Sequence, residues 1–100
     1  MAIKEVVVRT RPNTSVNFSA PNENGLPNDW KATDLASGEI ISFDESFSAD
    51  GLTKTVTTIF KDEEARTNYN NNSTYRSAMN TVKAEDVSNN ITKTVTITEV

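Results

Sequence analysis

Carboxylates are the candidate catalytic groups of this sequence, because it contains neither histidine nor cysteine. Two carboxylates that share a site can act as general acid and general base, and Asp44 and Glu45 are adjacent in the chain. Neighbouring residues of a strand point to opposite faces, so this pair cannot share a site. The acidic clusters at 62–64 and 85–86 lack the spacing of a calcium-binding loop, and charge at a helix start explains them better. We therefore predict no catalytic residue, no metal ligand and no cofactor.

Three aromatic residues, Trp30, Tyr69 and Tyr75, are the remaining candidates for a site. A single Trp in a small domain is usually a packing residue, and a core role is favoured for each Tyr as well. The alternative is a pocket or an interface that these three side chains line. The other candidates for an interface are three threonines of the last predicted strand, Thr92, Thr94 and Thr96.

Charge and composition restrict the possible partners. The net charge of −4 and the pI near 4.7 argue against nucleic acid as a partner. Lys4, Arg9 and Arg11 are the nearest approach to a basic patch, and solvated surface explains them equally well. Charged residues interrupt the apolar run of the first ten residues, so we expect neither a signal peptide nor a membrane partner. The 100 residues suffice for one domain, 1–100, with a thin core because only 35% of them are apolar.

The pattern of apolar residues and turn signals predicts short strands and helices. They are, in order, a strand at 3–10, a loop at 11–28 that holds all three prolines, a short helix at 30–36 with its cap in 27–29, strands at 39–47 and 52–60, helices that start at 61 and 73 and meet at a bend, and a strand at 91–99. In the second strand, a period of two places Ile41, Phe43 and Phe47 on one face. Ser73 is the expected cap of the last helix.

This order, βαββαβ, predicts an α+β ferredoxin-like fold, in which helices cover one face of a four-stranded antiparallel sheet. The other face of such a sheet is left uncovered. Sheet-to-sheet packing between two copies would cover it, so we expect a homo-oligomer, a dimer or larger.

The hairpin Phe43 to Phe60 is followed by a charged helix start at 61–65, a tyrosine one turn later and a closing strand. This arrangement resembles the second half of the dimeric α/β-barrel group that includes the antibiotic-biosynthesis monooxygenases. The resemblance covers roughly the last sixty residues and is a pattern of elements without a diagnostic motif. It implies a pocket between helices and sheet, which Trp30, Tyr69 and Tyr75 would line.

The segments 9–14 and 52–55 resemble small uncharacterised and virion-associated proteins of marine tailed phages, including cyanophages. The leading hypothesis is therefore a non-catalytic structural or interaction protein of a phage, which assembles through its sheet and is located in the virion or the host cytoplasm. One alternative is a small-molecule enzyme or binder of the dimeric α/β-barrel type, similar to the monooxygenases. Another is a phage factor that binds a host protein.

Overall fold

A computed structural model of the chain describes residues 1–20 and 30–100. The strands are β1 (Ile3–Thr10), β2 (Ile40–Phe47), β3 (Thr53–Phe60) and β4 (Thr92–Glu99), and the helices are α1 (Trp30–Ser37), α2 (Glu63–Asn71) and α3 (Ser73–Ser88). Their order is the predicted βαββαβ. The predicted ferredoxin-like α+β fold is confirmed, and the bounds of the elements agree closely with those expected from the apolar pattern.

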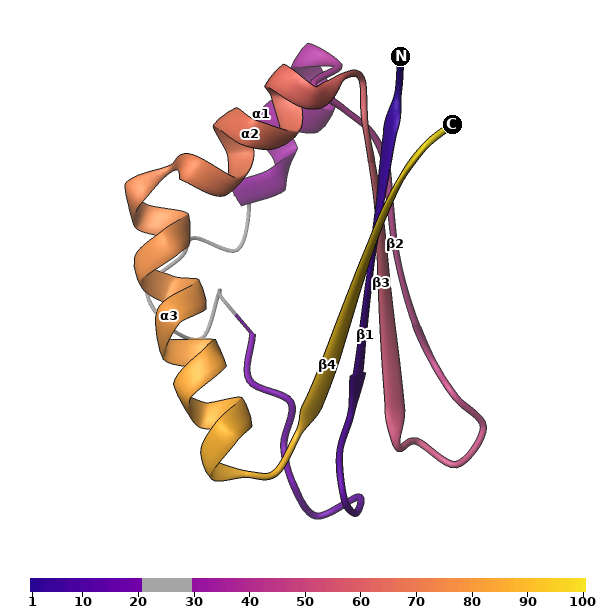
Figure 1. The fold of residues 1–100 in the computed structure, drawn as a ribbon, viewed down its shortest axis with the longest axis vertical. Helices are drawn as coiled ribbons and strands as arrows, with labels where there is room; N and C mark the ends of the chain where they lie inside the picture. Colours follow the sequence, from indigo (N-terminus) through magenta and orange to yellow (C-terminus); the bar gives the residue numbers. More distant parts are fainter. Residues whose placement is uncertain (21–29) are drawn as a thin grey trace.

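The sheet has the strand order β2-β3-β1-β4, and each neighbouring pair is antiparallel. All three helices lie on one side of the sheet, as Figure 1 shows. Because side chains alternate between the faces of a strand, Glu5, Val7 and Arg9 of β1 face the helices, whereas Val6 and Val8 face away. The sheet therefore has a helix-facing surface and an outer surface that no described element covers.

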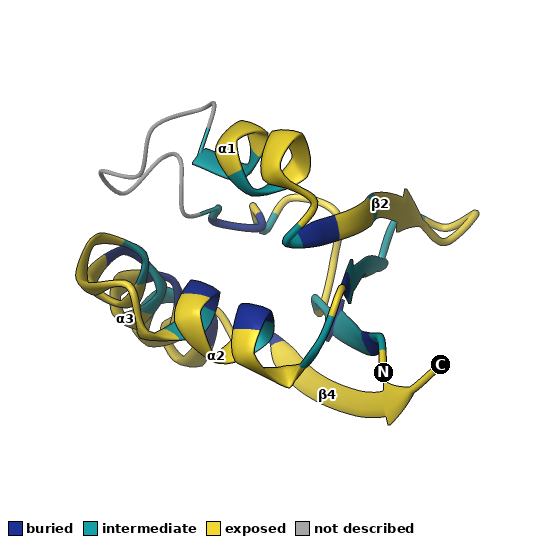
Figure 2. Cartoon of the chain, turned by 90° about the horizontal axis from the view of Figure 1, so that it is seen from above, coloured by how far each residue is buried: buried dark blue, intermediate teal, exposed yellow. Residues whose placement is uncertain are grey.

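The apolar core lies at the end of the sheet where α1 and α2 meet it. Its centre is formed by Ile40, Phe60, Ala65 and Tyr69, and the first three are almost completely buried. Figure 2 shows buried segments at the start of β2, in α2 and in α3. Helix α3 buries Ala78 and Val82, and its backbone stands apart from the strands along most of its length (Figure 1).

One feature of β2 corrects the expected strand faces. A β-bulge lies between Ile40 and Ser42, so that Ile40 pairs with Phe60 and Ser42 pairs with Ile59. Ile41 is the extra residue of the bulge and is 57% exposed, whereas Ile40 is 1% exposed. The expected strict period of two, with Ile41, Phe43 and Phe47 on one face, is therefore broken at Ile41, because an inserted residue shifts the alternation by one position.

The two C-terminal helices meet at a bend, as expected, and both begin at polar caps. The side chain of Asp62 accepts a hydrogen bond from the Ala65 amide, and Glu63 follows it in the first turn of α2. Asn72 ends α2 and caps α3 by accepting from the amides of residues 74 and 75, so the predicted cap at Ser73 lies one residue late. None of the described helices is long and apolar enough to cross a membrane.

The first half of the predicted loop, residues 11–20, folds against the end of the sheet at the β2–β3 turn. Arg11 donates hydrogen bonds to the carbonyls of Gly51 and Val16, and Phe18 is buried beneath the guanidinium groups of Arg9 and Arg11. These contacts tie the loop to the β2–β3 hairpin. The second half of the loop, including the expected helix cap at 27–29, lies outside the described residues.

Candidate functional site

A cavity of about 600 Å³ lies between the helix-facing surface of the sheet and the helices α2 and α3. Alternate residues of all four strands form its floor, among them Val7 of β1, Val56 of β3 and Val95 of β4. Helical side chains such as Tyr75 and Met79 form its walls. A volume of this size is typical of sites for small organic molecules.

Aromatic side chains form the end of the cavity next to the core. The ring centroids of Tyr69 and Tyr75 are 4.7 Å apart, those of Tyr69 and Phe60 are 5.6 Å apart, and those of Tyr69 and Trp30 are 6.5 Å apart. The Trp30 Nε1–H group is buried and has no hydrogen-bond acceptor within the described ranges. Trp30 also interacts with the Tyr69 hydroxyl, and this contact slightly opposes the rise of the Tyr69 pKa. A buried N–H group without an acceptor is a donor that a bound molecule can use.

Both tyrosines of this end stay protonated at neutral pH. Burial, and secondarily the neighbouring Tyr75, raises the pKa of Tyr69 far above its usual value of about 10. Burial, with a smaller contribution from Glu5, raises the pKa of Tyr75 to about 12. The two hydroxyls therefore act as neutral hydrogen-bonding groups and not as phenolate bases.

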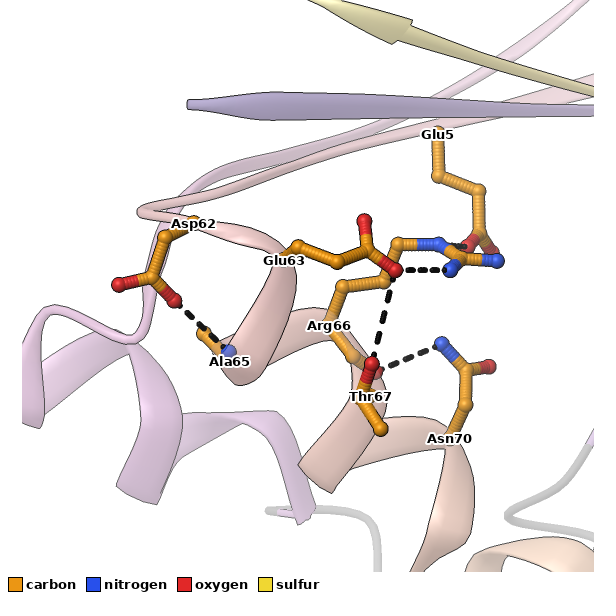
Figure 3. A network of polar contacts seen from close by, with 7 residues as sticks. All are labelled: Glu5, Asp62, Glu63, Ala65, Arg66, Thr67 and Asn70. Atoms are coloured by element: carbon orange, nitrogen blue, oxygen red, sulfur yellow. Dashed lines mark hydrogen bonds and ion pairs between the residues drawn. The ribbon is translucent and has the colours of Figure 1, made fainter. Parts of the chain in front are cut away.

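An ion-pair network fixes Arg66 at the side of the cavity, as Figure 3 shows. Its Nε donates to Glu5 Oε2 at 2.9 Å, and its Nη1 donates to Glu63 Oε1 at 2.9 Å. These two carboxylates keep the pKa of Arg66 raised although partial burial opposes this. The guanidinium group is therefore charged and held in one orientation.

A second ion pair closes the opposite end. Arg9 donates from Nη2 to Asp86 Oδ1 at 2.5 Å and from Nε to Asp86 Oδ2 at 3.1 Å, and the Arg9 and Asp86 side chains are 9% and 7% exposed. Nη1 of Arg9 also donates to the Ser19 carbonyl at 3.0 Å. The interpretation of Arg9 as solvated surface was wrong, and so was that of Asp86 as helix-start charge. The two side chains bury each other although they are 77 positions apart in the sequence.

Among the cavity lysines without an ion pair to another described residue, Lys31 and Lys93 have lowered pKa values. The Lys31 Nζ lies 3.9 Å from the centroid of the Phe43 ring, and its pKa is lowered mainly by burial. Lys93 lies at the open edge near Lys83, and partial desolvation together with repulsion from Lys83 lowers its pKa. Burial disfavours a charged group unless an opposite charge compensates it. These lysines are therefore cations that gain from an added negative charge.

The structure separates the residues that the sequence singles out into two surfaces. Trp30, Tyr69 and Tyr75 meet at the aromatic end of the cavity. Thr92, Thr94 and Thr96 alternate with the cavity-facing residues of β4 and therefore lie on the outer surface of the sheet.

Sequence reasoning missed the charged lining of the cavity. Lys54 of β3 and Lys93 of β4 share a strand face with valines, opposite the row of threonines. Glu5 and Arg9 flank Val7 on β1 in the same way. Charged residues on the apolar side of several strands indicate a sheet that faces a polar cavity, and this signal was present in the sequence.

Comparison with known proteins gives likenesses of structure and none of sequence. No family model matches the chain. No curated protein matches it either. Similar solved structures cover almost the whole chain.

One is SnoaB, described as a cofactor-independent oxygenase from Streptomyces nogalater, with a TM-score of 0.64 and 12% identity over 99% of this chain and 92% of that one. Another is described as a putative antibiotic biosynthesis monooxygenase from Deinococcus radiodurans, with a TM-score of 0.64 and 13% identity over 100% of this chain and 92% of that one. A third is described as a dimeric ferredoxin-like protein from an uncultured marine organism, with a TM-score of 0.58 and 12% identity over 99% of this chain and 94% of that one.

The likeness is one of fold. The chain has the ferredoxin-like fold of these monooxygenase structures, and the expected resemblance to that group is confirmed at this level. The expected likeness to phage proteins receives no support from the comparisons. The virion role and the host-binding role therefore rest only on the short sequence segments 9–14 and 52–55.

Proposed function

We propose that the protein binds a small aromatic molecule in the cavity between the sheet and α2–α3, and that it belongs functionally with the cofactor-independent oxygenases. The observation that carries this proposal is the cavity itself. It has about 600 Å³, and aromatic rings and the buried indole N–H group of Trp30 lie at its inner end. SnoaB, which has the same fold, is described as an enzyme of this class. The observed site thus favours the small-molecule alternative over a purely structural role.

The lining residues suit a planar ligand with an oxygen substituent. The ring of Tyr75 packs at an angle of 53° to that of Tyr69, so the pair presents both a ring face and a ring edge to the cavity. Trp30 Nε1–H and the protonated tyrosine hydroxyls are donors for an oxygen of the ligand. These groups bind and orient the ligand, and the Arg66–Glu5 ion pair forms a fixed polar wall beside it.

An oxygenase that works without a cofactor takes its electrons from the substrate. In the simplest balanced reaction, O2 converts an activated CH2 group into C=O and releases one molecule of water. Anthrone is a suitable test compound, because its CH2 group lies between two aromatic rings. Oxygen uptake with anthrone, in the absence of flavin, nicotinamide and metal, then distinguishes an enzyme of this class from a protein that only binds.

Ligand binding is tested with N-phenyl-1-naphthylamine, an uncharged aromatic dye that fluoresces in apolar sites. We expect the wild-type chain to bind the dye and the variant Val95→Trp to lose most of this binding. Val95 lines the cavity and is 45% exposed, so a larger ring at this position fills the cavity without displacing the core. Thr94→Trp is the matched control, since Thr94 lies on the outer surface. Equal binding by both variants, or no binding by the wild type, would refute the proposal.

A second proposal concerns assembly: two copies pack through the outer surfaces of their sheets. Val6 and Val8 of β1 and Ile59 of β3 form an apolar centre on this surface, between rows of threonines. The similar marine structure is described as dimeric. Size-exclusion chromatography with light scattering is expected to give twice the chain mass of 11.0 kDa. Val6→Lys is expected to give the single-chain mass and Val7→Lys, on the opposite face, the dimer mass. A wild type that is monomeric at all concentrations would contradict this.

A further inference from the structure

The cavity collects positive charge in a chain whose net charge is −4. Seven of the ten lysine and arginine residues line it, and only three acidic side chains of the described ranges do so. The rest of the surface is correspondingly acidic. This segregation makes the cavity the place where we expect an approaching anion to be most strongly attracted.

Three of the seven cations are neutralised by the three acids. Arg9 pairs with Asp86, and Arg66 pairs with Glu5. Lys54 Nζ lies 3.4 Å from Glu45 Oε2. The remaining four cations make no ion pair with another described residue: Lys31, Arg76, Lys83 and Lys93.

Lys83 and Lys93 lie close enough to repel each other at the open edge of the cavity, where α3 faces β4. The other charged groups that act on Lys93 are Arg9 and Glu5 of β1 and Asp86 of α3. Asp86 already accepts from Arg9 with both oxygens, and Glu5 accepts from Arg66. Asp86 and Glu5 therefore compensate Lys93 only in part, and neither lysine forms an ion pair with another described residue.

We propose that the ligand of this cavity is an aromatic anion, with its ring system at Tyr69 and Tyr75 and its negative group at Lys83 and Lys93. The proposal rests on the proposed function and specifies the class of molecule that the cavity accepts. Lysine ammonium groups are point charges on flexible stems, so they suit a carboxylate or sulfonate of variable position. Arg9, Lys54 and Arg66 are neutralised by the carboxylates of the cavity, and Lys31 and Arg76 are single charges. Lys83 and Lys93 are the two unpaired cations that act on each other, so we expect an anionic group to gain most at this pair.

The test uses two dyes with the same ring system. 1-Anilinonaphthalene-8-sulfonate carries a negative charge, and N-phenyl-1-naphthylamine is the same molecule without the sulfonate. We expect the wild-type chain to bind the sulfonate at least about tenfold more tightly, a ratio that corresponds to ~1.4 kcal/mol. The preference should shrink when ionic strength rises from about 0.01 M to about 1 M, because the screening length falls from roughly 30 Å to 3 Å.

The double variant Lys83→Gln/Lys93→Gln locates the effect. It is expected to lose the preference for the sulfonate and to keep the affinity for the uncharged dye. Lys4→Gln/Lys61→Gln changes the net charge by the same amount at residues outside the cavity lining, and it should keep the preference. Equal binding of both dyes by the wild type, or an unchanged preference in Lys83→Gln/Lys93→Gln, would overturn this inference and leave the proposed function standing. Failure of the wild type to bind either dye would refute both.

Discussion

The buried ion pair between Arg9 and Asp86 allows a prediction of known direction and size. Asp86→Asn removes one charge of a pair whose side chains are only 9% and 7% exposed, and it leaves Arg9 charged and buried. Breaking such a pair costs about 3–5 kcal/mol, because the remaining charge has lost its compensation. Both carboxylate oxygens accept from the guanidinium group, so the structure places this pair within that range.

The assay is unfolding by urea and by heat. For a chain of 100 residues, each kcal/mol lowers Tm by about 4–8 °C, so Asp86→Asn is expected to lower Tm by roughly 12 °C or more. Lys61→Gln is the control, because it breaks only the exposed pair of Lys61 with Glu39, and it should leave Tm almost unchanged. A loss of less than about 1 kcal/mol in Asp86→Asn would show that the pair is not buried as described.

Three further outcomes follow from the caps, the turn and the tyrosines. Asp62→Ala should lower the free energy of unfolding by about 0.5–2 kcal/mol, because the Ala65 amide loses its acceptor. Asp62→Asn keeps a capping side chain and should lower the free energy of unfolding much less, and urea titrations compare the two variants. Gly51→Ala should cost about 1–2 kcal/mol by the same assay, since Gly51 has a φ of 73°. Tyr75 should titrate near pH 12 when absorbance at 295 nm is followed. Its pKa in the unfolded chain is about 10, so its contribution to the free energy of unfolding is complete below pH 10 and is lost as pH rises towards 12. Tyr75→Phe should remove this part of the loss of stability between pH 10 and pH 12.

The fold was predictable because its strands follow a strict period of two. In β4, threonines alternate with Lys93, Val95 and Ile97, so both the strand and its faces can be assigned from the sequence alone. The bulge at Ile41 was not predictable, because Ile40 and Ile41 are both apolar. The sequence therefore does not show which of the two points into the core. The cap of α3 at Asn72 was missed for a similar reason, because Asn72 and Ser73 are both good caps.

The candidate site was predictable only in part. The meeting of Trp30, Tyr69 and Tyr75 was foreseen as one possibility, because these are large rings in elements that must share one side of the sheet. The pairing of Arg9 with Asp86 was not, since nothing local in either segment points to a partner 77 residues away. The charge of the cavity emerges only when the inward-facing positions of several strands are read together, and this needs the register of the sheet.

The central claim is that the cavity, and not the outer surface of the sheet, holds a small aromatic ligand. The most direct measurement is a titration with 1-anilinonaphthalene-8-sulfonate followed by amide chemical shifts of the labelled protein. We predict saturable shifts at Tyr75, Lys83 and the cavity-facing residues of β4, with smaller shifts at Val6 and Val8 of the outer surface. Shifts that centre on Val6 and Val8, or no saturable shifts at all, would contradict the account.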